Sequence, residues 1–245
     1  MTPIKNIKNS MNDEHYNRYY FAADFMSGQK ILDAACGEGG GSCLLSKEAN
    51  EVFGIDLREG ALEYAKKSCD SKNIKFIAGN VVKLPFEENF FDGAVSFETI
   101  EHLNESDQET FLSELNRVVK PGGKIIISTP DKNSWRKLGL RWDDHLCELD
   151  FKQFGELLGK YFSVKEYFRQ GRVLDNSSVP KVAARNSINF IKNLDVFDLR
   201  HRFFPKRLRS NIDNLTKLVD TSPEICKMDS ANETAVTIIA VCDNR

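Results

Sequence analysis

Two carboxylates and a histidine stand close together near the middle of the chain. Glu98 is followed, at spacings of three and four residues, by Glu101 and His102. On a helical turn these spacings place the three side chains on one face, because residues three and four apart are neighbours there. Two carboxylates and one imidazole form a ligand set suited to Mg, Mn, Fe(II) or Zn. The pattern therefore indicates a candidate divalent metal site, for which His145 is the obvious candidate for a further ligand.

The same group also allows chemistry without a metal. Glu98 would then order its loop or contact a cofactor, and His102 would act as a general base or as a hydrogen-bonded structural histidine. His15 and His145 could each accept a proton from a hydroxyl group, since histidine titrates near neutral pH. The residue types alone leave the metal and the acid–base interpretations open.

A glycine-rich loop between two acidic residues is the second group that could do chemistry. Asp33 lies in the apolar run 30–36, which leads into a loop with four glycines among residues 37–41. Backbone without side chains lets a ligand approach closely. Asp56 stands nineteen residues after Gly37, at the end of the next apolar run, where an acid can accept hydrogen bonds from two ribose hydroxyls. Both features fit a cofactor that contains adenosine.

The elements that position these residues follow an alternating pattern. Apolar runs of strand length alternate with helical patterns from residue 30 to about 170, which predicts βαβ units and a parallel sheet. Ser106 and Glu109 predict a capping box at the start of one helix. The predicted strands are 30–36, 51–56, 74–80, 92–98, 124–130, 164–169 and 233–241, and the predicted helices are 41–49, 58–69, 106–119 and 151–161.

Length and composition favour a single soluble domain. A chain of 245 residues fits one α/β domain over 1–245, and residues 171–230 lack the βαβ rhythm, so we expect an inserted lid there. The net charge of -2 argues against a surface that binds nucleic acid or membranes in general. The six cysteines form no CxxC pair, which predicts reduced thiols, and the N-terminus lacks an apolar signal segment, so we expect a cytoplasmic protein.

Two adenosine cofactors compete for the glycine loop. A dinucleotide fingerprint would put Gly or Ala where helix packs on strand, but counting from Gly37 reaches Ser42. S-adenosylmethionine (SAM) has no pyrophosphate, and its ammonium and sulfonium groups favour a nearby acid such as Asp33. The residues therefore favour SAM over a dinucleotide.

Four segments together resemble the successive motifs of class I SAM-dependent methyltransferases. They are ILDAACGEGGGS, FGID, LPFEENFFDGAVSFETIEHL and KPGGKIIISTP, in order and spacing, over about residues 28–130. The resemblance implies an α/β fold with a Rossmann-like sheet, mostly parallel with the last strand antiparallel, and an inserted lid before that strand. It also implies a SAM-dependent methyltransferase activity.

The resemblance also implies which residues contact the cofactor. Segment 15–22 is similar to an N-terminal helix that closes over SAM, where Arg18 could pair with the methionine carboxylate. Ala35 stands where many members have Gly, and Asn80 where many have Asp. The implied cofactor residues are Arg18, Asp33, Ala35, Gly37, Asp56, Leu57, Asn80, Val81 and Phe97.

Glu98, Glu101 and His102 look like the ExxEH ligands of ubiquinone-biosynthesis O-methyltransferases and small-RNA 2'-O-methyltransferases, the latter with a later histidine. A Mg or Mn ion there would lower the pKa of an acceptor hydroxyl and hold it in line with the methyl group. Many relatives carry only the EH pair and use no metal.

The methyl acceptor is the least determined feature. Residues 143–170 resemble small methyltransferases of envelope-polysaccharide biosynthesis, and nine basic against three acidic residues between Arg172 and Arg209 favour an anionic acceptor. We therefore expect O-methylation of a small phosphorylated or sugar-like molecule in capsule or envelope precursor synthesis, rather than a nucleic-acid or membrane partner. The alternatives are a quinone-pathway methyltransferase, an RNA 2'-O-methyltransferase and a catalytically silent SAM-binding protein. Phenylalanines in the lid support the first of these: Phe190, Phe197, Phe203 and Phe204.

Overall fold

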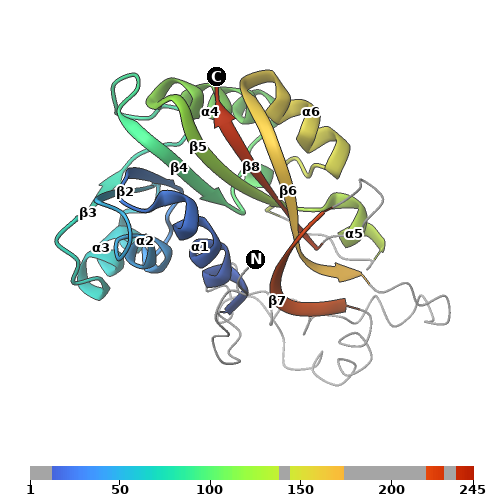
Figure 1. Cartoon of the computed structure of the whole chain (residues 1–245), viewed down its shortest axis with the longest axis horizontal. Helices are drawn as coiled ribbons and strands as arrows, with labels where there is room; N and C mark the ends of the chain where they lie inside the picture. The colour runs from blue at the N-terminus through green and yellow to red at the C-terminus, as the bar shows by residue number, and fades with distance from the viewer. Residues whose placement is uncertain (1–12, 138–143, 174–218, 229–235) are drawn as a thin grey trace.

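The structure is a computed structural model that describes residues 13–137, 144–173, 219–228 and 236–245. Its centre is one eight-stranded sheet with the strand order β3-β2-β1-β4-β5-β8-β6-β7 (Figure 1). The strands are β1 (Lys30–Ala34), β2 (Glu51–Asp56), β3 (Ile74–Ala78), β4 (Phe91–Phe97), β5 (Val119–Pro130), β6 (Phe162–Val173), β7 (Val219–Lys227) and β8 (Thr237–Asn244).

The sheet has a parallel and an antiparallel part. Strands β1 to β5 pair in parallel, and β8 then pairs antiparallel with β5. On the far side of β8, β6 and β7 continue the sheet in antiparallel pairs. The prediction of a mostly parallel Rossmann-like sheet with an antiparallel last strand is confirmed.

Strand β7 lies inside the range 171–230 that was predicted as an inserted lid. Its pairing with β6 makes residues 219–227 part of the sheet. Period-two patterning is weak in this segment, which contains Pro223 and two acidic residues, so an edge strand was hard to predict there. Residues 174–218 lie outside the described residues, and the lid itself stays a prediction.

Helices cover both faces of the sheet. They are α1 (Asp13–Met26), α2 (Gly40–Leu45), α3 (Glu59–Ser68), α4 (Glu105–Val118), α5 (Lys132–Lys137) and α6 (Phe151–Tyr161), with a short 3-10 turn at Ile100–His102. The predicted capping box of Ser106 and Glu109 is wrong, because Asn104 is the N-cap of α4 and its side chain accepts a hydrogen bond from the Asp107 backbone N–H. No helix in the described ranges has the length and apolar character needed to cross a bilayer.

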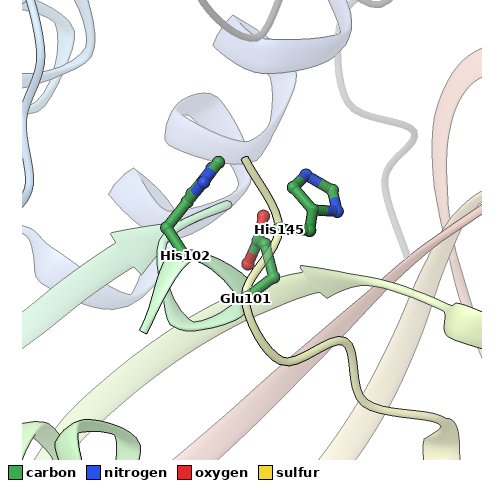
Figure 2. A group of neighbouring side chains, drawn as sticks. All are labelled: Glu101, His102 and His145. Carbon is green, nitrogen blue, oxygen red and sulfur yellow. The ribbon is translucent and has the colours of Figure 1, made fainter. Parts of the chain in front are cut away.

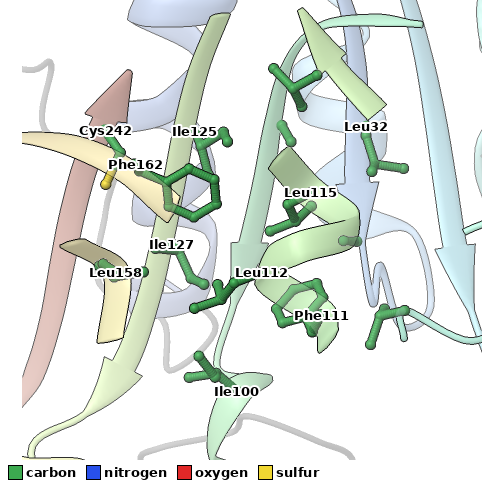
Figure 3. Close-up of a cluster of buried hydrophobic side chains, with 14 of the residues drawn as sticks. Leu32, Ile100, Phe111, Leu112, Leu115, Ile125, Ile127, Leu158, Phe162 and Cys242 are labelled. Carbon is green, nitrogen blue, oxygen red and sulfur yellow. The ribbon is translucent and has the colours of Figure 1, made fainter. Parts of the chain in front are cut away.

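Alternate residues of the central strands pack into two hydrophobic cores, one on each face of the sheet. Ile125 and Ile127 of β5 pack with Phe111 of α4 and Leu158 of α6 (Figure 3), whereas Ile126 faces the α1 side. This alternation is the period-two geometry of a strand. Burial on both faces explains the almost continuous apolar run of β5. The buried strands therefore hold their carboxyl ends, where the chemically active side chains stand, in fixed positions.

Candidate functional site

Asp56, the last residue of β2, joins the glycine loop to the start of α3. The Gly37 backbone N–H donates to Asp56 Oδ2 at 2.8 Å, and the Arg58 backbone N–H donates to Oδ1 at 2.9 Å. The carboxylate is 6% exposed, and Arg58 Nε lies 3.3 Å from Oδ1. Each carboxylate oxygen can accept more than one hydrogen bond, so this acid can still accept from a ligand hydroxyl.

Most glycines of this loop serve packing rather than ligand approach. A Cβ on Gly39 would lie 2.6 Å from the Ala65 Cβ of α3, and a Cβ on Gly41 would lie 2.1 Å from the ring of Tyr19 in α1. Gly37 differs, because its φ is 58° and the nearest atom to an added Cβ is an Arg58 nitrogen at 3.6 Å. The prediction that the whole loop leaves room for a ligand is therefore corrected to Gly37.

Asp33 is a fully buried carboxyl group beneath this loop. Ser42 Oγ donates to its Oδ2 at 2.6 Å and Tyr19 Oη donates to its Oδ1 at 3.2 Å. Burial raises the pKa of Asp33 to about 7, although both hydrogen bonds oppose the shift; the nearby charge of Asp56 raises it further. Asp33 therefore titrates near neutral pH and would respond to a cationic ligand.

The remaining predicted cofactor residues lie in varied environments. Ala35 has a φ of 66°, a left-handed conformation that costs a non-glycine residue about 1–2 kcal/mol. Leu57, directly after Asp56, is 70% exposed, whereas Val81 is buried. The Asn80 side-chain carbonyl accepts from the Val82 N–H at 3.1 Å. Phe97 is buried against Tyr19, with ring centroids 4.9 Å apart, so its ring is a core group.

Arg18 of α1 is a buried cation with neutral partners. It is 2% exposed. One terminal nitrogen donates to the side-chain oxygen Oε1 of Gln170 at 2.6 Å, and the other lies 3.4 Å from His15 Nδ1. Among the residues the structure describes, its Nε has no hydrogen-bond partner. A buried guanidinium that forms no ion pair with a described residue is a candidate receptor for an anionic group.

His15 is a weak base in this environment. Burial, and then the charge of Arg18, lower its pKa to about 3. At neutral pH the imidazole is uncharged and has little affinity for a proton. This favours a role in positioning Arg18 over the predicted role as a proton acceptor.

Three of the four predicted metal ligands come together. One ligand atom each from Glu101, His102 and His145 lies within 4.8 Å of the others, and Figure 2 shows the Glu101 carboxylate between the two imidazoles. Glu98 is not in this group. It has a φ of 52°, and Ser128 Oγ donates to its Oε1 at 2.6 Å. The predicted single face fails for Glu98 because the chain does not form a regular helix from 98 to 102.

Backbone hydrogen bonds hold His145 beside Glu101, although 44 positions separate them. The N–H groups of Leu146 and Cys147 both donate to the Glu101 carbonyl, at 2.9 and 3.1 Å. His145 Nδ1 lies 3.2 Å from Glu148 Oε1. The position of His145 is thus fixed by its own side chain and by the two residues that follow it.

Glu101 is the most buried group of this cluster. It is 1% exposed, and Thr129 Oγ1 donates to its Oε2 at 3.2 Å. Its Oε1 is also buried, with no hydrogen-bond partner in the described part of the chain. Burial, and then the charge of Glu98, raise the pKa of Glu101 well above its ordinary value. Burial, and then His102, lower the pKa of His145. The cluster therefore favours neutral groups until a cation joins it.

Sequence reasoning missed the residues that position this site. Two of them, Ser128 and Thr129, could have been predicted, because they are polar residues at the carboxyl end of the apolar strand β5. The missed residues are Tyr19, Ser42, Ser128, Thr129 and Gln170. The basic and aromatic side chains proposed for acceptor binding, including Arg207 and Arg209, lie outside the described residues.

Comparison with known proteins connects this geometry to one family. Residues 32–127 match a family model described as "Methyltransferase domain". A probable S-adenosylmethionine-dependent methyltransferase of Mycolicibacterium smegmatis is 36% identical over 46% of this chain and 43% of its own length. The demethylmenaquinone methyltransferase of Lactococcus lactis is 37% identical over 58% of this chain and 57% of its own. This chain thus spans about half the length of these curated relatives.

Solved structures show the same fold over nearly the whole chain. A chain from the complex of the Haloferax volcanii Trm112 methyltransferase activator with its methyltransferase has a TM-score of 0.62 and 15% identity. The alignment covers 96% of this chain and 92% of that chain. Residues 32–127 are therefore similar to a methyltransferase domain, and the chain has the fold of these solved structures.

Proposed function

We propose that the protein transfers the methyl group of SAM to a small-molecule acceptor at the carboxyl edge of β1, β2, β4 and β5. The observation that carries this proposal is Asp56. It is anchored by two backbone N–H groups and stands where an acid binds both hydroxyls of a ribose. The matched domain and the methyltransferases among the relatives support the reaction type.

The surrounding residues suit the other parts of SAM. The exposed side chain of Leu57 offers an apolar surface for the adenine, next to Asn80 and Val81. The methionine moiety would extend along Ala35 and Gly37. Its carboxylate would meet the buried Arg18, and its positive charges would lie nearest Asp33.

For the acceptor, we propose a small aromatic molecule of quinol type as the first candidate. The demethylmenaquinone methyltransferases among the relatives support this choice over the capsule or polysaccharide role. A phosphorylated or sugar-like acceptor, methylated on oxygen, is the second candidate. The basic run between Arg172 and Arg209 favours it.

We also propose that Glu101, His102 and His145 hold a divalent metal. The ligand set fits, because the buried Oε1 of Glu101 is left without a hydrogen bond beside two imidazoles. When bound, a metal of the Mg or Mn class supplies Lewis acidity that lowers the pKa of an acceptor hydroxyl. In either case the backbone bonds from residues 146 and 147 keep His145 aligned with Glu101.

A transfer assay with radiolabelled SAM tests the proposed function. Purified protein would be incubated with a panel of demethylated quinols, phenols, nucleotide sugars, sugar phosphates and RNA. We expect label on at least one small-molecule class and none on RNA. A protein that binds SAM but labels only RNA would overturn the choice of acceptor, and one that does not bind SAM would overturn the proposal as a whole.

SAM binding should strengthen with pH near neutrality. Asp33 has a pKa of about 7, so the fraction of carboxylate rises from pH 6 to pH 8, and the carboxylate form attracts the cationic donor. We expect Kd to fall roughly tenfold over this range and to level off above about pH 8. Calorimetry at several pH values checks this, and Asp33→Asn should remove the dependence. A flat Kd in the wild type would show that Asp33 is already ionised at pH 6.

A further inference from the structure

A disulfide links the two helices that flank the proposed cofactor site. Cys43 of α2 is bonded to Cys69, which follows α3 directly, with their Cα atoms 5.9 Å apart. The prediction of reduced thiols is wrong for this pair. The two cysteines are 26 residues apart and share no CxxC spacing, so no local pattern predicts their pairing. Cys36, Cys147, Cys226 and Cys242 are free thiols.

The bond closes a ring that contains the ribose-binding acid. Between Cys43 and Cys69 the chain forms β2, Asp56 and the whole of α3. The loop before α2 contributes the Gly37 N–H that Asp56 accepts, and the residue before α3 contributes the Arg58 N–H. The disulfide thus links α2, which follows the glycine loop, to the end of α3. Asp56 is hydrogen-bonded to the segments that precede both helices.

The loop before α2 packs closely against α3 and β3. Gly39 is the N-cap of α2, and a Cβ there would collide with Ala65 Cβ and the Phe76 ring, both at 2.6 Å. A small shift of α3 relative to α2 would therefore change the position of the loop that carries Gly37. Without the disulfide, only non-covalent contacts would oppose such a shift.

Polar contacts near the disulfide join the end of α2 to the segment that follows α3. Ser46 Oγ donates to Ser71 Oγ at 3.0 Å, and Asn73 Nδ2 donates to the Ser46 carbonyl at 2.9 Å. These contacts do not involve the sulfur atoms, so they would oppose a wide separation of the reduced cysteines. The bond can then form again without refolding of the domain.

A reductant can reach this disulfide but not the core thiols. Cys43 and Cys69 are both partly exposed, whereas Cys36 and Cys242 are buried. Burial raises the pKa of Cys242 to about 12 and that of Cys36 higher still, which leaves both as unreactive thiols. Cys147 and Cys226 are also partly exposed, but they are single thiols and not part of a disulfide.

We propose that the Cys43–Cys69 disulfide is a reversible redox clamp that holds the SAM-binding loop in its high-affinity position. A dithiol reductant attacks one sulfur through its thiolate and forms a mixed disulfide, which its second thiolate then resolves. Two electrons pass from the dithiol, which leaves as a disulfide. Cys43 and Cys69 each gain a proton and end as thiols. Oxidised glutathione reverses the exchange and is itself reduced to two thiols.

The clamp rests on the proposed SAM site, so its test needs one readout that involves SAM and one that does not. The first is the calorimetric Kd for SAM in the oxidised protein, after reduction by dithiothreitol, and after reoxidation by oxidised glutathione. The second is amide hydrogen exchange of residues 36–41 without ligand. Mass spectrometry after thiol alkylation assigns the state of Cys43 and Cys69 in each sample.

We expect reduction to raise Kd roughly fivefold to twentyfold, a typical size of coupling between two sites, and to speed exchange in the loop. Reoxidation should restore both values. The double variant Cys43→Ser/Cys69→Ser should match the reduced protein in every condition, and the control Cys226→Ser should behave as the wild type.

Two results would overturn the clamp. One is the finding of free thiols at Cys43 and Cys69 after treatment with oxidised glutathione. The other is loop exchange that is the same in the oxidised and reduced proteins. If neither state binds SAM, the proposed function fails, and the exchange measurement still decides whether the disulfide controls the loop.

Discussion

Replacement of Asp56 by alanine is expected to raise the Kd for SAM by at least about 100-fold. A carboxylate that accepts two ribose hydroxyls makes two hydrogen bonds to a charged group, each worth about 1.5–3 kcal/mol. The same substitution removes the acceptor of the Gly37 and Arg58 N–H groups, so the loop loses its anchor as well. Isothermal titration with SAM gives the change directly.

Asp92→Ala is the matched control for this experiment. Asp92 also accepts a backbone N–H, from Lys30 at 2.8 Å, and pairs with Lys120, but it stands at the amino end of β4. Its removal should leave the Kd for SAM within about twofold of the wild type. Equal effects of the two substitutions would mean that Asp56 acts through stability alone, and the ribose assignment would then be wrong.

Glu101→Gln is expected to lower turnover by about 100-fold to 1000-fold while the Kd for SAM stays within about threefold. Glutamine keeps the size of the side chain and resembles the neutral carboxyl group that burial favours. It cannot supply the carboxylate that a divalent metal requires. A large loss of turnover therefore indicates that Glu101 acts as an anion.

Chelation completes this second experiment. Exhaustive chelation should abolish turnover of the wild type, and added Mn or Mg should restore it, but neither metal should rescue Glu101→Gln. Glu114→Gln serves as the control, because Glu114 lies on α4, away from the cluster. Its carboxylate is hydrogen-bonded to Arg117 of the same helix and to the Leu84 backbone N–H. Full turnover after chelation, with Glu101→Gln equally active, would remove the metal and leave His102 and His145 as candidate bases.

Local patterns were sufficient to predict much of the parallel sheet. The alternation of apolar runs with helical segments predicted β1 to β5 because each element carries its own period and its own ends. The helix predicted at 151–161 has the bounds of α6. Asp150 and Gln153 form a capping box there, and such a motif is readable from four neighbouring residues.

Contacts between distant segments could not be predicted in this way. Arg18 donates to Gln170 across 152 positions, and Cys43 is bonded to Cys69 across 26 positions. Glycines posed a related difficulty, since Gly39 makes room for Ala65 rather than for a ligand. Each of these pairings depends on tertiary packing, which no periodicity in the sequence encodes.

The exclusion of Glu98 from the histidine cluster has the same origin. A spacing of three residues predicts a shared face only on a regular helix, and the left-handed backbone at Glu98 breaks that condition. The hydroxyl of Ser128, at the end of the neighbouring strand β5, instead donates a hydrogen bond to the Glu98 carboxylate. His145 could be named from its residue type, whereas its backbone link to Glu101 needed the fold.

A crystal structure with S-adenosylhomocysteine bound would test the proposed SAM site. Both ribose hydroxyls should lie within hydrogen-bond distance of Asp56, the adenine against Leu57, and the amino-acid carboxylate near Arg18. A ribose bound elsewhere, or the same position occupied by a nicotinamide dinucleotide in preference to S-adenosylhomocysteine, would contradict it.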